Sequence, residues 1–303
     1  MPLLLHYAAL EQMRGGLQPA SAFLQLLRGL VRKYPKDFLT YVDGGAGTGC
    51  VAKEFLTILT EEFPFDTGAA ARLYMYEPLP ENYQILREAY ANDARCVLRN
   101  AALSDSAGSA VFSVPSRMAA DLGMWRSGTS YNGSLVEIPG YEQIEVACTT
   151  LAAELPDGAD VVKLDLQGGE DRAMAGFGDK FGRTKIYYIE HELLHQKQVF
   201  ARLVASGYSL FFDRLQLGFY PQVKTIPLVQ LTHCGVTVDS VFVNPDIGAL
   251  LWGYFSKDLI DRKTYSLTES AVTMFRNLKV AYLQTDVIAV RNDFVADALR
   301  ILL

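Results

Sequence analysis

The chain has 303 residues, of which 50% are hydrophobic and 20% are charged, so it can form an apolar core and is not a disordered chain. Its 28 Lys and Arg residues against 34 Asp and Glu residues give a net charge of -6, which leaves no overall positive field for nucleic acid or anionic lipid. No uncharged apolar run approaches the roughly 20 residues of a membrane span, and Met1–Leu5 does not resemble a signal peptide. We therefore expect a cytoplasmic protein that has no membrane span and does not bind nucleic acid.

The hydrophobic pattern predicts strands that alternate with helices. Apolar residues recur at helical steps from Ala20 to Arg32, and a short strand at Phe38–Val42 then runs into glycines before a helix at Val51–Leu59. The alternation continues with strands at Arg72–Tyr76, Arg95–Arg99, Val161–Asp165 and Ile186–Ile189, and with helices at Glu81–Tyr90 and Glu170–Phe177. This order indicates an α/β fold with a parallel sheet and helices on both faces.

The remaining segments are less regular. Glycines and a proline interrupt the pattern between Val111 and Thr150, which is typical of a lid or binding loop. Later elements are a helix at Gln196–Ser206 and strands at Tyr208–Phe212 and Val238–Val243, the last pair antiparallel, followed by a mainly helical tail after Pro245. We expect one elaborated domain at residues 38–245, with helical extensions at 1–37 and 246–303.

A glycine-rich turn between the first strand and its helix is the most informative stretch. Glycine at positions 45, 47 and 49 allows the backbone to approach a ligand closely, and the start of the next helix offers unpaired N–H groups. A nucleotide-like cofactor is the natural occupant of such a turn. Glycine-rich turns also connect strands to helices without binding anything, so the turn alone is a weak indication.

Two carboxylates narrow the choice of cofactor. Asp43 precedes the glycines at the strand end, where it would repel a pyrophosphate but could accept hydrogen bonds from an ammonium group, directly or through water. Glu77 follows the second strand beside Pro78 and Pro80, and it is suited to accepting hydrogen bonds from both hydroxyls of a ribose. Together they favour S-adenosylmethionine over a nicotinamide dinucleotide.

With these residues, the sequence resembles the FkbM family of S-adenosylmethionine-dependent methyltransferases, which mostly methylate hydroxyl oxygens. Six motifs carry the resemblance, in the family's order, from residue 42 to about residue 192. They are Val42–Gly49, Glu77–Tyr83, Asn100–Asp105 with Gly108, Gly133–Leu135, Thr149–Leu151, and Val162–Gly168 with Glu170. One departure is Gly44, which stands where the family usually has an aliphatic residue.

The resemblance implies a Rossmann-like class I methyltransferase fold, with a seven-stranded, mostly parallel sheet whose last strand is antiparallel. It also implies the residues that hold S-adenosylmethionine. Asp43, Gly45, Ala46, Gly47 and Gly49 would contact its methionine part, Glu77 its ribose, and Asn100, Ala101, Ala102 and Leu103 its adenine, with Pro78 completing the set.

Candidate catalytic residues lie where two later strands end, because ligands of open parallel sheets bind beyond the carboxyl ends of the strands. Asp165 could orient the acceptor, act as a general base, or only pair with Lys163. His191 has a pKa near neutrality that suits proton removal, and Glu190 lies beside it. Asp165, Glu190 and Glu192 are also candidate ligands for Mg²⁺, which would lower the pKa of the acceptor hydroxyl.

Two alternatives belong to other classes of protein. His191-Glu192-Leu-Leu-His195 satisfies the pattern of a zinc-dependent hydrolase, but the motif directly follows an apolar strand instead of lying on a long helix, so we interpret it as a coincidence. A non-catalytic cofactor-binding scaffold is the other alternative. The sequence favours transfer of a methyl group to a hydroxyl oxygen of a small molecule, a sugar or a polyketide-type natural product.

Overall fold

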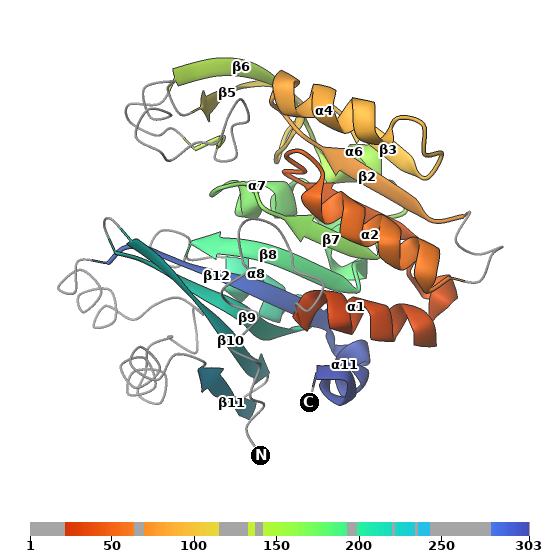
Figure 1. Ribbon diagram of the computed structural model, residues 1–303, viewed down its shortest axis with the longest axis vertical. Coiled ribbons are helices and arrows are strands. Elements are labelled where there is room, and N and C mark those ends of the chain that lie inside the picture. The colour runs from red at the N-terminus through yellow and green to blue at the C-terminus, as the bar shows by residue number, and fades with distance from the viewer. Residues whose placement is uncertain are drawn as a thin grey trace. The chain divides into compact units, whose positions relative to one another are not determined.

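The computed structural model describes residues 22–63, 70–114, 133–136, 142–192, 199–219, 222–233, 236–242 and 280–302 (Figure 1). The chain divides into two compact units. One comprises residues 27–185, and the other comprises residues 186–303 with the N-terminal residues up to 26. Helix α1 (Ala22–Lys33) buries the apolar face predicted for it. None of the helices in the described part is both long and apolar enough to cross a membrane.

The unit of residues 27–185 is built on a parallel sheet with the strand order β7-β1-β2-β3. These strands are β1 (Thr40–Gly44), β2 (Arg72–Tyr76), β3 (Cys96–Arg99) and β7 (Val161–Leu164). All three strand pairs are parallel. The helices of this unit are α2 (Cys50–Glu61), α4 (Pro80–Tyr90), α6 (Leu151–Glu154) and α7 (Glu170–Ala175), and in Figure 1 α2 lies along the sheet.

Hydrophobic spacing explains these elements. In α2, Val51, Phe55, Ile58 and Leu59 recur at helical steps and are all buried, so one face of the helix packs on the sheet. Helix α4 begins at Pro80, a residue whose fixed φ and missing N–H suit the first turn of a helix. Strands β1 and β7 are buried along almost their whole length, which is typical of a parallel sheet covered on both faces.

A second, three-stranded sheet in the same unit has the order β4-β6-β5. It consists of β4 (Ala102–Leu103), β5 (Gly108–Val114) and β6 (Glu142–Thr149). The prediction of an irregular loop from Val111 to Thr150 is therefore wrong at both ends, which form strands β5 and β6. In β6 the buried Val146 and Cys148 alternate with exposed neighbours, which is the period of a strand with one face on a core.

The unit of residues 186–303 contains a sheet with the order β11-β10-β9-β12-β8, in which every neighbouring pair is antiparallel. Its strands are β8 (Ile186–Glu192), β9 (Tyr208–Phe219), β10 (Gln222–His233), β11 (Val236–Phe242) and β12 (Val280–Arg291). Its helices are α8 (Val199–Ala205) and α11 (Val295–Leu302). The strand β10, which the sequence did not predict, forms a long hairpin with β9.

The predicted fold class is confirmed, with one correction. Strand β12 lies between β8 and β9 and runs antiparallel to both, so it is the reversed last strand of the Rossmann-like fold. Val238–Val243 does not have this role, and the tail after Pro245 is not mainly helical where it is described. The buried run Val287–Val290 was ambiguous because a short apolar run fits a buried strand and a buried helix equally well. The expected domain limits stay predictions, since residues 1–21 and 243–279 lie outside the described residues.

Candidate functional site

Three strands of the parallel sheet end at one edge. Gly44, the last residue of β1, lies opposite Tyr76 and Leu164, the last residues of β2 and β7. The glycine turn, Glu77 and Asp165 therefore leave the sheet from the same edge. A Cβ atom at Gly45 would lie 2.0 Å from the carbonyl oxygen of Asp165, so the turn and the end of β7 touch where only glycine fits.

The N–H groups of the turn are bonded within the protein. Those of Gly45 and Ala46 both donate to the carbonyl oxygen of Tyr76, at 3.0 Å each. The N–H of Gly47 donates to Oε2 of Glu77 at 2.8 Å. A phosphate-binding turn leaves such groups free for its ligand, so this turn is poorly suited to a diphosphate.

Gly49 is confined on the helix side of the turn. Its φ of 91° is in the left-handed region, and a Cβ atom there would lie 2.4 Å from the ring of Tyr90. The Tyr90 hydroxyl donates to the carbonyl oxygen of Gly49 at 2.9 Å, and the N–H of Gly49 donates to the carbonyl oxygen of Ala46, also at 2.9 Å. The turn is thus closely packed on this side, and Gly49 is required by its neighbours.

Asp43 is fully buried and does not face solvent. The ammonium nitrogen of Lys163 lies 3.1 Å from its Oδ1. Burial raises the pKa of Asp43, and the positive charge of Lys163 opposes that rise. The carboxylate that the sequence assigned to the cofactor's methionine part therefore contacts a buried lysine in this structure.

Lys163 is the residue that sequence reasoning undervalued. It was considered only as a partner of Asp165, and the structure places its Nζ 3.7 Å from Oδ2 of that residue. Its hydrogen bonds go to the carbonyl oxygens of Gly44 and Gly45, at 3.2 and 2.8 Å. The available signal was a lysine inside a strand that is otherwise apolar, because a buried ammonium requires several partners.

Asp165 is the accessible carboxylate of this group, with 38% of its side chain exposed. Nε2 of Gln167 donates to its Oδ1 at 2.8 Å. Gln167 has a φ of 51°, which is unusual for a residue other than glycine, and its carbonyl oxygen accepts a 2.6 Å hydrogen bond from the buried hydroxyl of Ser134. The segment after β7 is therefore held in one conformation, which fixes the Asp165 carboxylate at the sheet edge.

Glu77 is 4% exposed and is held by donors from two elements. In addition to the Gly47 N–H, its carboxylate accepts hydrogen bonds from the N–H of Leu79 at 3.0 Å and from Nδ2 of Asn82 at 3.4 Å. Burial outweighs these bonds and raises the pKa of Glu77 to about 7. The carboxylate therefore titrates near neutral pH.

The adenine-binding turn expected at Asn100–Leu103 lies beside Glu77. Nδ2 of Asn100 donates to the carbonyl oxygens of Glu77 and Pro78, at 2.8 and 3.0 Å, so it joins the two segments. The next three residues are buried. A Cβ atom at Gly44, where the FkbM family usually has an aliphatic residue, would lie 2.9 Å from Cδ1 of Leu103 and 3.2 Å from the carbonyl oxygen of Lys163, so the space at this position is tight.

The residues expected from β8 belong to the other unit. Glu190 is partly buried, and it lies opposite Asp286 of β12. The backbones of His191 and Glu192 are part of β8, while their side chains and the whole of His195 lie outside the described residues. The hydrolase alternative needs residues 191–195 in one helix, and it is excluded because His191 and Glu192 are in a strand.

Metal binding finds no support in the described part of the chain. There, no group of three or more His, Cys, Asp or Glu side chains is placed to hold an ion. The Mg²⁺ site expected from Asp165, Glu190 and Glu192 stays a prediction, as does the participation of Glu190 and His191 in catalysis.

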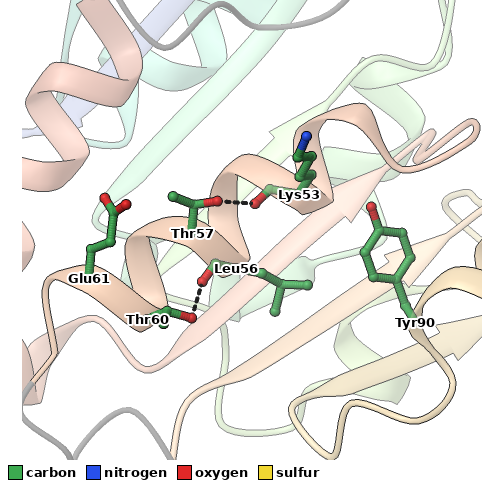
Figure 2. A pocket seen from close by; sticks show the side chains of 6 residues that line it. All are labelled: Lys53, Leu56, Thr57, Thr60, Glu61 and Tyr90. Atoms are coloured by element: carbon green, nitrogen blue, oxygen red, sulfur yellow. Dashed lines mark hydrogen bonds between the residues drawn. The ribbon is translucent and has the colours of Figure 1, made fainter.

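A groove outside this site lies along the outer face of α2 (Figure 2). Its volume is about 370 Å³, and it is lined by Lys53, Leu56, Thr57, Thr60, Glu61 and Tyr90. The two threonine hydroxyls already donate to carbonyl oxygens of their own helix. The groove therefore offers a ligand few uncommitted polar groups.

The fold is Rossmann-like, and its glycine turn lies at the carboxyl ends of the parallel strands. The sequence profile of the Methyltransferase FkbM domain family matches residues 51–218, more than half of the chain. The chain belongs to this family. The matched region includes Glu77, Asp165 and His191 and begins directly after the glycine turn.

Several solved structures are similar in part. Methyltransferase FkbM from Methylobacillus flagellatus KT is 15% identical over 53% of this chain, with a TM-score of 0.35, and the match spans only 34% of that protein. A precorrin-6y C5,15-methyltransferase from Geobacter metallireducens GS-15 is 11% identical over 89% of this chain and 87% of its own, with a TM-score of 0.37. At such low TM-scores these likenesses do not bear on function. Among curated proteins, no sequence matches the chain significantly.

Proposed function

We propose that the protein transfers a methyl group from S-adenosylmethionine to a hydroxyl oxygen of a small molecule, a sugar or a polyketide-type natural product. The observation that carries the choice of cofactor is the glycine turn. Its first three N–H groups are bonded to Tyr76 and Glu77, and buried carboxylates lie on both sides of it. A diphosphate would find few free donors there, and the carboxylates of Glu77 and Asp165 at the same strand ends favour a cationic sulfonium compound over it.

The residues present fit such a cofactor. At Gly45 and Gly49 a Cβ atom would clash with Asp165 and Tyr90, so these glycines let the turn pack closely at the strand ends beside Glu77. The Glu77 carboxylate has about four lone-pair positions and three donors, the N–H groups of Gly47 and Leu79 and Nδ2 of Asn82, so one ribose hydroxyl could donate to it directly and a second if the Gly47 N–H gives way. The Asn100–Leu103 turn beside it would take the adenine. S-adenosylmethionine, when bound, would supply an electrophilic methyl group.

Asp165 is our candidate for the acceptor side. It is much more exposed than Asp43, Glu77 or Lys163, and it stands at the end of β7 against the glycine turn. Its carboxylate, held by Gln167, would orient the acceptor hydroxyl and take its proton. Glu190 and His191 at the end of β8 are further candidates for this proton transfer.

The first test is calorimetric titration with S-adenosylhomocysteine. Wild-type protein should bind it, and Glu77→Ala should bind it more weakly. NAD titrated in the same way should give no binding. Preference for the dinucleotide, or no binding of S-adenosylhomocysteine, would overturn the choice of cofactor.

The second test uses labelled S-adenosylmethionine with a panel of sugar and polyketide hydroxyl acceptors, with and without a chelator. For an acceptor that is methylated, Asp165→Asn should lower kcat by about 10²- to 10⁴-fold with little change in cofactor affinity. Asp105→Asn, at an exposed aspartate paired with Arg172, is the matched control and should leave the rate unchanged. Equal rates for both variants would remove Asp165 from catalysis. A protein that binds cofactor but methylates nothing would be a scaffold.

A further inference from the structure

Lys163 connects parts of the site that the sequence motifs treat separately. Its Nζ contacts four oxygens, the carbonyl oxygens of Gly44 and Gly45 at 3.2 and 2.8 Å, and carboxylate oxygens of Asp43 and Asp165 at 3.1 and 3.7 Å. One side chain of β7 thus contacts the end of β1, the first residue of the glycine turn and the accessible carboxylate.

The two carbonyl contacts fix the turn from one side. In a trans peptide the C=O and N–H groups point in opposite directions. The carbonyl oxygens of Gly44 and Gly45 accept from Lys163 on β7, while the N–H groups of Gly45 and Ala46 donate to Tyr76 on β2. The two successive peptide planes that start the turn are therefore held between the two strands on either side of β1.

Burial makes this lysine indispensable for Asp43. The Lys163 side chain is 4% exposed, and that of Asp43 is fully buried. A buried carboxylate without a counter-charge is strongly destabilised in its ionised form. Because Lys163 itself is almost inaccessible, it does not reach a ligand directly in this structure and is not a catalytic residue.

We propose that Lys163 is a positioning residue for cofactor binding, whose ammonium group holds the glycine turn between β7 and β2 and supplies the counter-charge of Asp43. The proposal rests on the proposed function, because its readout is binding of the cofactor product. It assigns to Asp43 a role exerted through Lys163, in place of the direct contact that the motif suggests.

The charged and titratable groups around Asp43 give this proposal a pH signature. Lys163 and Asp165 face it from β7 and its end, Glu77 follows β2, and Tyr90 approaches from α4. Burial raises the pKa of Asp43, Asp165 raises it further, and Lys163 lowers it. Removing the lysine charge removes the main opposing effect, so Asp43 would take up a proton at a pH closer to neutrality.

The experiment compares binding of S-adenosylhomocysteine to wild type, Lys163→Met and Lys53→Met from about pH 6 to about pH 8.5. Lys53 is an exposed lysine of α2 and serves as the matched control. We expect Lys163→Met to bind about 10- to 100-fold more weakly at neutral pH, as is typical when a supporting partner of a binding group is lost. This loss of affinity should become smaller toward low pH, because protonation of Asp43 removes the uncompensated buried charge. Lys53→Met should match wild type throughout, and titration of Glu77 is common to all three proteins.

The double variant Asp43→Asn/Lys163→Met keeps the test decisive if Lys163→Met fails to fold, because it removes both buried charges together. The affinity of the double variant should not show the extra pH dependence expected for Lys163→Met. It should still bind about tenfold more weakly than Asp43→Asn, because the carbonyl oxygens of Gly44 and Gly45 have lost the Lys163 donor. Equal affinity of Lys163→Met and Lys53→Met, or of the double variant and Asp43→Asn, would overturn the proposal. Failure of wild type to bind would instead overturn the proposed function, and this proposal with it.

Discussion

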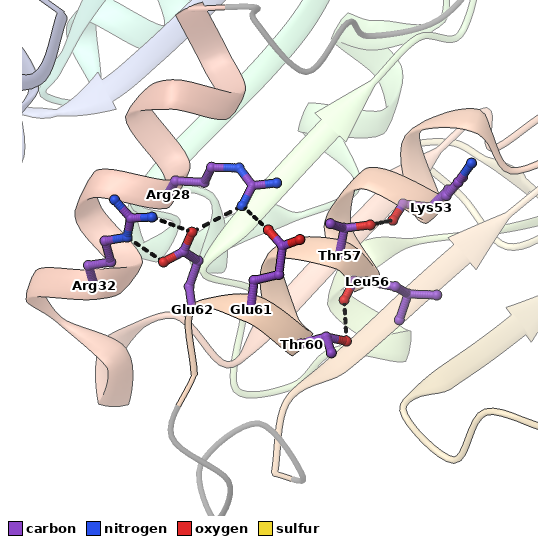
Figure 3. A network of polar contacts seen from close by, with 8 residues as sticks. All are labelled: Arg28, Arg32, Lys53, Leu56, Thr57, Thr60, Glu61 and Glu62. Carbon is purple, nitrogen blue, oxygen red and sulfur yellow. Dashed lines mark hydrogen bonds and ion pairs between the residues drawn. The ribbon is translucent and has the colours of Figure 1, made fainter.

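The unit of residues 27–185 contains two clusters of ion pairs that use similar groups in opposite surroundings. At the sheet edge, Lys163 and Asp43 pair with almost no exposure to solvent. At the surface, Arg28 and Arg32 of α1 meet Glu61 and Glu62 at the end of α2 (Figure 3). The comparison shows that burial, more than the number of contacts, decides how much the loss of one charged partner changes the free energy of unfolding.

The two clusters also differ in what they hold. The surface cluster joins the ends of two helices, and water can replace Arg32 and Glu61, whose side chains are 67% and 56% exposed, although the Glu62 side chain is only 5% exposed. The buried cluster holds a backbone turn, and no solvent is available there to compensate for a missing partner. Substitutions should therefore have very unequal effects in the two places.

The largest effect is expected for Asp43→Ala. The variant leaves the Lys163 ammonium buried beside two carbonyl oxygens and the partly exposed Asp165 at 3.7 Å, and removing one partner of a buried pair lowers the free energy of unfolding by about 3–5 kcal/mol. Urea denaturation measures this loss. A loss no greater than that of the exposed control Asp105→Ala would show that the pair is not an important part of the fold.

The second-largest loss of stability is expected for Gly45→Ala, with Gly178→Ala as its matched control. Both glycines have positive φ, 69° and 56°, but a Cβ atom at Gly178 has no neighbour within 4 Å, whereas at Gly45 it meets a carbonyl oxygen. Gly178→Ala should lose about 1 kcal/mol from the backbone alone, and Gly45→Ala about 1–3 kcal/mol more from overpacking. Thermal unfolding of the two variants checks this, and equal losses would mean that the turn can move away from β7.

A smaller, pH-dependent effect is expected at Glu77. Its pKa is about 7 in the folded protein against an ordinary value of 4.5. The folded state therefore binds the proton more tightly, and this contribution to stability is complete below about pH 4.5 and is lost as the pH rises through 7. Relative to Glu77→Gln, which cannot ionise, the free energy of unfolding should decrease by up to about 3 kcal/mol over this range.

Urea denaturation of both proteins at several pH values measures the difference. A constant difference between wild type and Glu77→Gln across this range would contradict the raised pKa. Bound S-adenosylhomocysteine should make the free energy of unfolding less dependent on pH. Its ribose hydroxyls would donate to the ionised Glu77 carboxylate and so lower the pKa of this group.

The smallest effect is expected at the surface cluster. Arg32→Gln removes one partner of Glu62 while Arg28 remains, and salt screens what is left. The decrease in Tm should be less than for any variant above and should disappear in about 1 M salt. A large decrease in Tm that persists in about 1 M salt would show that solvent does not weaken the ion pairs of this cluster.

The sequence predicted the parallel strands, the position of the glycine turn and the shared edge from local periodicity and motifs. It did not predict that Asp43 and Glu77 are buried, because the direction of a carboxylate depends on partners distant in the chain, Lys163 for one and Gly47 for the other. The left-handed Gln167 had no signal at all, since its conformation depends on Ser134 from another segment. Strand β12 was not predicted because its apolar run Val287–Val290 fits a buried helix as well as a buried strand.

The hydrogen bond from Gly47 to Glu77 has a kinetic consequence. A diol that is to reach the Glu77 carboxylate has to compete with this backbone donor, so the turn must detach locally before the nucleoside can settle. Association would then proceed through a rare open form, and its observed rate would level off at high ligand concentration instead of rising in proportion to it.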